Sequence, residues 1–345
     1  MGKPDAIKFL VRIGYFAPFL AGLAMLNWVC AQRPVRNLFS ATLDEAAEAL
    51  IAGKTIRSRV DMRDLKPIWV EHWHESPDVI VLGSSRLAQV DGDWFRPRRM
   101  ANLAMMASDF SDAVSILQEC LDTGKAPKLV VLELNPTLTF EGSSQVAPVL
   151  EPHLQRALLH YRIFPPRFFS GSLTLDSLRW DPRILMRRNV WEVSDKIDRG
   201  EYRMRPDGSA DWDLTVSQRT PAEVEQDVVW QMHNPDPAHL RWRTSSHPGW
   251  LDHKILLAFL DDMRARGIRV AVLLVPLHPT AYNFYSRQGG YDESWIRSDM
   301  EHRGVTVIGE FSPVAARATR DDFYDAVHPH AAVLRRLLQE ARIIE

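Results

Sequence analysis

The sequence predicts an α/β fold, a parallel sheet between two layers of helices, preceded by one transmembrane helix. Short apolar runs that end at glycine or at a polar residue are typical of strands buried on both faces of a parallel sheet. Segments with helical periodicity separate these runs, and this alternation indicates βαβ units with right-handed crossovers. The transmembrane helix is predicted from a 19-residue stretch without a formal charge near the N-terminus.

The uncharged stretch runs from Ile13 to Ala31 and reads IGYFAPFLAGLAMLNWVCA. As a helix it is about 28 Å long, close to the hydrocarbon thickness of a bilayer. We therefore expect residues 1–36 to be a single-pass anchor in the inner membrane, with the rest of the chain on the periplasmic or extracytoplasmic side. A cleaved signal peptide is one alternative, because Val29-Cys30-Ala31 resembles a cleavage site. A buried helix of a soluble protein is the other.

Composition excludes several classes of protein. The 46% of hydrophobic and 25% of charged residues are average for globular chains, which excludes disordered and fibrous proteins. Forty-two basic against 44 acidic residues leave no excess positive charge for nucleic acid. Two cysteines, Cys30 and Cys120, exclude a disulfide framework. The chain has no phosphate-binding loop, dinucleotide motif or EF-hand spacing, and His72-Trp73-His74 has no partner cluster, so we expect neither cofactor nor metal.

The predicted elements follow one another along residues 76–345, after a polar connector at residues 37–75 with helical stretches, one of them at 40–53. Strands are predicted at 78–83 (DVIVLG), 128–135 (KLVVLELN) and 268–276 (IRVAVLLVP), and more weakly at 100–105 and 304–309. Helices are predicted at 111–123, 251–266 and 331–342. Glycine directly after the first two helices is a typical C-terminal signal.

Residues 140–250 interrupt the alternation. The segment is rich in Trp, Arg and Pro, and it contains a turn signal at 205–208 (RPDG). We interpret it as an insertion within one domain, because the strand after it is needed to complete the sheet. Its six tryptophans either stack on sugar rings or fill a core.

Ser85 is the first candidate for chemistry. It belongs to Leu82-Gly83-Ser84-Ser85-Arg86, directly after the first predicted strand. A serine there projects from the carboxyl edge of the sheet, where open α/β sheets bind ligands. A helix beginning at residues 86–90 would place N-terminal amides where they stabilise an oxyanion. Ser85 is thus a candidate nucleophile, although a serine in a loop is often only an N-cap.

Asp325 and His328 form the second candidate element, in DDFYDAVHPH at 321–330. An aspartate three residues before a histidine allows one short turn to present both side chains. The histidine would take the serine proton, and the aspartate would fix the histidine tautomer and stabilise the imidazolium. The alternative is that Asp325 caps the last helix and His328 lies on the surface.

Together the two elements resemble the SGNH, or GDSL, hydrolase superfamily, whose nucleophile follows the first strand and whose Asp and His share a late DxxH. The resemblance covers roughly residues 76–345 without the insertion. It implies a flavodoxin-like three-layer core, with Ser85 as nucleophile, His328 as base and Asp325 as the group that orients the base. Ser84 stands where GDSL enzymes have aspartate.

The same resemblance implies an oxyanion hole made by the N–H of the nucleophile, a glycine N–H in a second block and an asparagine in a third. The second block here, 101–108 (ANLAMMAS), lacks glycine, so the amide of Ala104 or Ala107 would have to donate. The third block supplies Asn135 at the end of a strand, where an ordinary turn residue is the alternative. Further candidates for oxyanion, anchoring or substrate contacts are Asn102, Arg86 and His278.

A narrower resemblance rests on GSS in place of GDS, the N-terminal apolar segment and Val275-Pro276-Leu277-His278-Pro279. These features resemble membrane-anchored extracytoplasmic SGNH proteins of alginate or cellulose O-acetylation and teichoic-acid D-alanylation. The resemblance implies a serine-dependent O-acyltransferase, acting with an acyl donor, a cell-surface polysaccharide as acceptor and a membrane-bound O-acyltransferase (MBOAT) as partner. Two alternatives remain: a carbohydrate O-acetyl esterase of the same fold, and a non-catalytic scaffold for the MBOAT, which the missing glycine favours.

Overall fold

In a computed structural model of the chain, part of the sequence is described. The described residues are 43–58, 61–106, 108–134, 150–163, 191–194, 202–211, 219–234, 250–287 and 293–345. No helix within these ranges is long and apolar enough to cross a bilayer. The expected anchor at residues 13–31 lies outside them.

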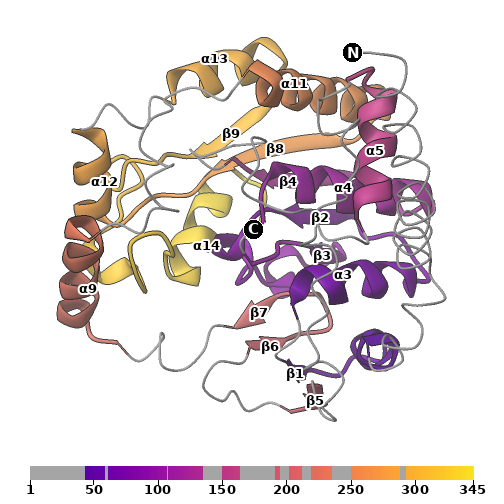
Figure 1. Cartoon of the computed structure of the whole chain (residues 1–345), viewed down its shortest axis with the longest axis horizontal. Helices are drawn as coiled ribbons and strands as arrows, with labels where there is room; N and C mark the ends of the chain where they lie inside the picture. The colour runs from indigo at the N-terminus through magenta and orange to yellow at the C-terminus, as the bar shows by residue number, and fades with distance from the viewer. Residues whose placement is uncertain are drawn as a thin grey trace, which may run out of the picture.

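A parallel five-stranded sheet forms the centre of the molecule (Figure 1). Its strands lie in the order β3-β2-β4-β8-β9, and every neighbouring pair is parallel. Numbered along the chain within this sheet, the order is 2-1-3-4-5, one of the two common orders of doubly wound sheets. The strands are β2 (Val79–Leu82), β3 (Met100–Asn102), β4 (Leu129–Glu133), β8 (Arg269–Leu274) and β9 (Thr306–Gly309). All five coincide with the predicted apolar runs, which confirms the α/β class and the parallel sheet.

Alternate residues of each strand pack on opposite faces of the sheet, as the two-residue period of a strand requires. Ile80 and Val130 belong to one hydrophobic cluster, while Val79 and Val131 belong to another. The first face is covered by α3 (Met62–Glu71), α4 (Phe110–Asp122), α5 (Glu151–His160), α11 (Trp250–Ala265) and α13 (Ser294–His302). The second face is covered by α14 (Ala331–Glu340) and the loops after β2. Among the described residues, the sheet therefore has a layer of helices on its first face and α14 with the loops after β2 on its second.

A second, antiparallel sheet joins the connector to the insertion. Its order is β5-β1-β6-β7, with β5 (Trp191–Val193), β1 (Ile56–Ser58), β6 (Tyr202–Met204) and β7 (Ala210–Asp211). Only β1 comes from the connector, and it pairs with β5 and β6 of the insertion. The connector also forms α3, whose side chains Leu65 and Trp69 are buried in the same cluster as the first sheet face. This segment, expected to be a polar connector, contributes to the core because its apolar residues recur at helical spacing.

The hairpin of β6 and β7 docks on the loops that follow β2 and β3. Its turn occupies the predicted position, with the Gly208 N–H donating to the Arg205 carbonyl at 2.9 Å. The Asp207 carbonyl accepts the Asn102 N–H at 2.7 Å, and the Ala88 carbonyl accepts the Ala210 N–H at 2.7 Å. The insertion thus holds the segments next to Ser85 from one side.

Gly208 makes this docking possible, and its replacement by alanine tests it. Gly208 has φ +80°, and a Cβ there would lie 2.4 Å from the Asn102 carbonyl oxygen. We expect Gly208→Ala to lower the free energy of unfolding by about 3 kcal/mol, because backbone strain and a steric clash add. The matched control is Gly267→Ala, where φ is +71° and the space is open, with a loss of about 1 kcal/mol. Equal losses in urea denaturation would contradict the docking role.

Candidate active site

Ser85 lies at the carboxyl edge of the parallel sheet, as expected. The chain leaves β2 at Leu82, passes Gly83 and enters the short 3-10 helix η1 (Ser85–Leu87), whose N-cap is Ser84. The expected helix at 86–90 is therefore only this one tight turn. Within η1, Arg86 and Leu87 are buried and Ser85 is half-buried at the edge where ligands of doubly wound sheets bind.

Ser85, His328 and Asp325 form one chain of hydrogen bonds. The Ser85 Oγ lies 2.9 Å from the His328 Nε2, and the His328 Nδ1 lies 2.7 Å from the Asp325 Oδ2. With the proton of neutral His328 on Nδ1, that ring atom donates to Asp325 and Nε2 accepts from the serine hydroxyl. The structure thus brings together the three residues that the sequence singled out, in the order that nucleophilic serine chemistry requires.

Asp325 is held by the backbone of its own loop. Its Oδ1 accepts the N–H groups of Val327 at 2.8 Å and His328 at 2.9 Å. Burial by itself raises the pKa of Asp325, but hydrogen bonds from the His328 ring and these two N–H groups outweigh it, so the pKa lies below its ordinary value. The carboxylate is therefore ionised at neutral pH and can stabilise an imidazolium.

His278 lies behind this loop rather than at its surface. Its side chain is fully buried and caps α12 (Pro279–Ser286), with Nδ1 accepting the Thr280 N–H at 3.2 Å. Its own N–H donates to the Ala326 carbonyl at 3.1 Å. Burial lowers the pKa of His278, against the nearby Glu225 carboxylate, which raises it. The expected contact with substrate is not supported, because His278 supports the Asp325 loop from inside.

Asn102 is also internal. Its side-chain amide donates to the carbonyls of Leu87 at 2.8 Å and Val90 at 2.9 Å, and its Oδ1 accepts the Ala104 N–H at 2.9 Å. Asn102 is fully buried, and both it and the Ala104 amide are used within the fold. Neither is available for the expected oxyanion contact; Asn102 instead ties the segment after η1 to the end of β3. The two other candidates, Ala107 and Asn135, lie outside the described residues.

Glu133, at the end of β4, is the residue that sequence reasoning missed. Its carboxylate accepts the Ser84 N–H at 2.6 Å, the Ser84 hydroxyl at 2.9 Å and the Arg86 Nε–H at 2.6 Å. Arg86 is itself buried and forms an ion pair with Glu133, so it serves as a local anchor and not as a surface contact. The sequence did contain one signal, a single carboxylate at the end of an otherwise apolar strand. A charge buried there needs a partner, which would have indicated an ion pair or hydrogen bonds at this position.

Lys66 of α3 is a second buried charged group near the site. Its Nζ donates to the carbonyls of Asn102 at 2.9 Å and Ala104 at 2.5 Å. Burial lowers the pKa of Lys66 to about 7, while Asp207 raises it. Lys66, which belongs to the connector, therefore fixes the backbone of residues 102–104 at the end of β3.

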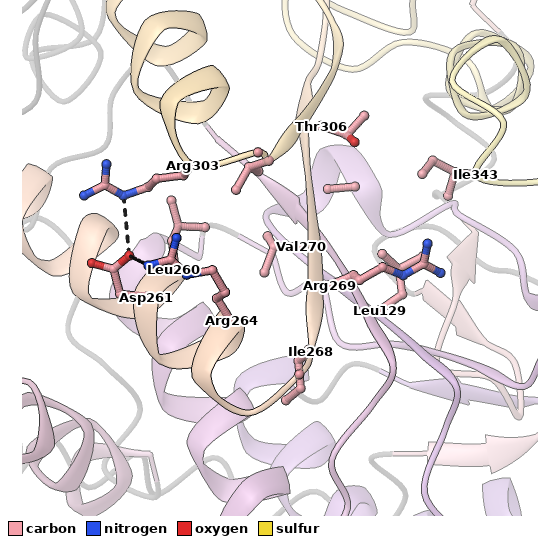
Figure 2. Close-up of a pocket in the computed structure, with 14 residues that line it drawn as sticks. Leu129, Leu260, Asp261, Arg264, Ile268, Arg269, Val270, Arg303, Thr306 and Ile343 are labelled. Carbon is pink, nitrogen blue, oxygen red and sulfur yellow. Dashed lines mark hydrogen bonds and ion pairs between the residues drawn. The ribbon is translucent and has the colours of Figure 1, made fainter.

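The pocket in Figure 2 lies elsewhere, at the amino edge of the sheet. Its volume is about 310 Å³, and its walls include Arg269 at the start of β8, Thr306 at the start of β9 and Arg303 after α13. Arg303 approaches Asp261, which is also in the wall (Figure 2). None of the Ser85, His328 or Asp325 side chains lines this pocket.

Lys66 generates a prediction for the pH dependence of stability. Because the pKa falls from 10.5 to about 7 on folding, the unfolded chain binds more protons between these pH values, and stability rises with pH there. Relative to Lys66→Met, the unfolding free energy of the natural protein should rise by about 2 kcal/mol from pH 7 to pH 9. Chemical denaturation at each pH measures it. The control Lys128→Met, at an exposed lysine, should show no such difference, and parallel curves for all three proteins would contradict the burial argument.

Comparison of the chain with protein-family models, curated proteins and solved structures found no match. The chemistry of the site is therefore inferred from its own arrangement. That arrangement is a serine–histidine–aspartate chain at the carboxyl edge of a parallel sheet, with a buried carboxylate behind the serine loop.

Proposed function

We propose that the protein is a serine-dependent acyltransferase that forms an acyl-enzyme at Ser85 and passes the acyl group to a polysaccharide hydroxyl. The observation that carries the proposal is the unbroken chain from the Ser85 hydroxyl through His328 to Asp325. A serine hydroxyl is a weak nucleophile unless a base lies within hydrogen-bond distance and a third group orients that base. Both conditions are met here, and the serine and its base are 243 positions apart in the sequence.

The geometry favours Ser85 over the adjacent Ser84 as the nucleophile. The Ser84 hydroxyl donates to the Glu133 carboxylate, whereas the Ser85 hydroxyl lies against His328. Transfer of the Ser85 proton to His328 allows the Ser85 Oγ to attack the acyl carbonyl, and Asp325 stabilises the resulting imidazolium. His328 then returns the proton to the leaving alcohol, and an acyl-serine remains.

The oxyanion of the tetrahedral intermediate needs donors beside Ser85. Among the residues that the structure describes, the Ser85 N–H has no hydrogen-bond acceptor, and it follows a residue whose own N–H is held by Glu133. A fixed backbone N–H of this kind stabilises developing negative charge. We assign the first oxyanion donor to the Ser85 N–H.

In the second half of the reaction, His328 removes a proton from the acceptor, which attacks the acyl-serine. Acceptance by a polysaccharide hydroxyl is transfer, and acceptance by water is ester hydrolysis. The choice of an O-acetyl group, a cell-surface polysaccharide, an extracytoplasmic site and an MBOAT partner rests on the resemblance described above and on the apolar segment at 13–31. An O-acetyl esterase would use the same residues. A non-catalytic scaffold would not need the triad geometry, which disfavours that alternative.

Ser85→Ala tests the proposed nucleophile. With the full-length protein in detergent and p-nitrophenyl acetate as substrate, the loss of the nucleophile should lower kcat/KM by at least about 10³-fold. A fluorophosphonate probe should label the natural protein and not the variant.

The matched control is Ser298→Ala, which removes an exposed hydroxyl from α13 and should retain full turnover and labelling. Turnover or labelling that survives Ser85→Ala would contradict a Ser85 acyl-enzyme.

Transfer and hydrolysis are distinguished in the cell. Deletion of the encoding gene should reduce the ester-linked acetyl content of the surface polysaccharide if the protein transfers acetyl to it. The acetyl released by mild base measures this content. A gain of acetyl on deletion would contradict transfer and indicate an esterase. Complementation by the natural chain but not by Ser85→Ala assigns the effect to the site.

A further inference from the structure

A buried ion pair lies directly behind the nucleophile loop. The Glu133 and Arg86 side chains are only 1% and 4% exposed. Glu133 contacts both residues that flank Ser85, through the Ser84 N–H and hydroxyl and through the Arg86 guanidinium. The loop is thus fastened on each side of Ser85 to the same carboxylate.

The close approach of this carboxylate depends on Gly83. In the β2–β4 register Leu82 lies opposite Leu132, so Gly83 and Glu133 follow as the next pair. A Cβ on Gly83 would lie 2.5 Å from the Glu133 Oε2 and 2.6 Å from the Glu133 Cβ. The glycine therefore provides the space in which Glu133 reaches the Ser84 N–H.

We infer that Glu133 is the positioning residue of the nucleophile. This inference rests on the proposed function and adds a residue that acts on Ser85 through its neighbours. Ser85 must keep its Oγ at 2.9 Å from the His328 Nε2, and displacement of the loop by about 1 Å is enough to break such an alignment. Glu133 holds the loop by hydrogen bonds to an ionised acceptor, which are the stronger kind.

The test is kinetic and uses the full-length protein in detergent with p-nitrophenyl acetate. Glu133→Asp keeps the carboxylate on a shorter side chain, which cannot reach both residues that flank Ser85, so kcat should fall about 10-fold or more with KM changed less than threefold. The matched control is Glu119→Gln, at a buried carboxylate of α4, which should leave the kcat of the folded protein unchanged.

The two proposals fail differently. If the natural protein shows no Ser85-dependent turnover or labelling, the proposed function fails. If turnover depends on Ser85 but Glu133→Asp has the same kcat as the natural protein and as Glu119→Gln, the positioning role of Glu133 is overturned.

Discussion

Burial of charge at one edge of the sheet is the constraint on which the site depends. A charged side chain away from water must be paired and hydrogen-bonded, so each buried charge fixes the backbone that supplies its partners. The buried Glu133 fixes the loop before and after Ser85, and the half-buried Asp325 fixes the backbone around His328. Lys66 fixes the carbonyls at the end of β3. Hydrogen bonds to these charged groups therefore fix the backbone of the loops that form the site.

The insertion and the connector complete this arrangement. The Asp207 carbonyl of the β6–β7 hairpin accepts the Asn102 N–H, and Lys66 of α3 donates to the carbonyl of the same residue. Both elements belong to the hydrophobic cluster on the first face of the main sheet. A segment inserted late in the sequence and one that precedes the first main strand therefore support the same loop. The two segments function as parts of the scaffold of the site.

Sequence patterns predicted the elements whose signal is local. Buried parallel strands are apolar along their whole length, so all five runs could be recognised, and Asp325 with His328 is a pattern confined to one turn. The roles of Asn102 and His278 could not be predicted, because a polar residue near a strand end faces either the edge or the interior. Only the long-range packing of the 87–90 segment and of the Asp325 loop decides between them. Glu133 and Lys66 were missed for the same reason, since their partners lie 49 and 36 positions away.

The contact between Ser85 and His328 depends on register more than on any local motif. A slip of β2 by one residue against β4 would turn its side chains to the opposite face. Gly83 would then no longer lie beside Glu133, and the carboxylate would lose the space it occupies. On the other side, α14 packs its Val333 and Leu337 into the cluster that contains Val79 and Val131, and so holds the segment that carries His328 against the same strands. Because Gly83 has no Cβ, Glu133 can approach the serine loop, and the packing of the sheet thereby sets the position of the nucleophile.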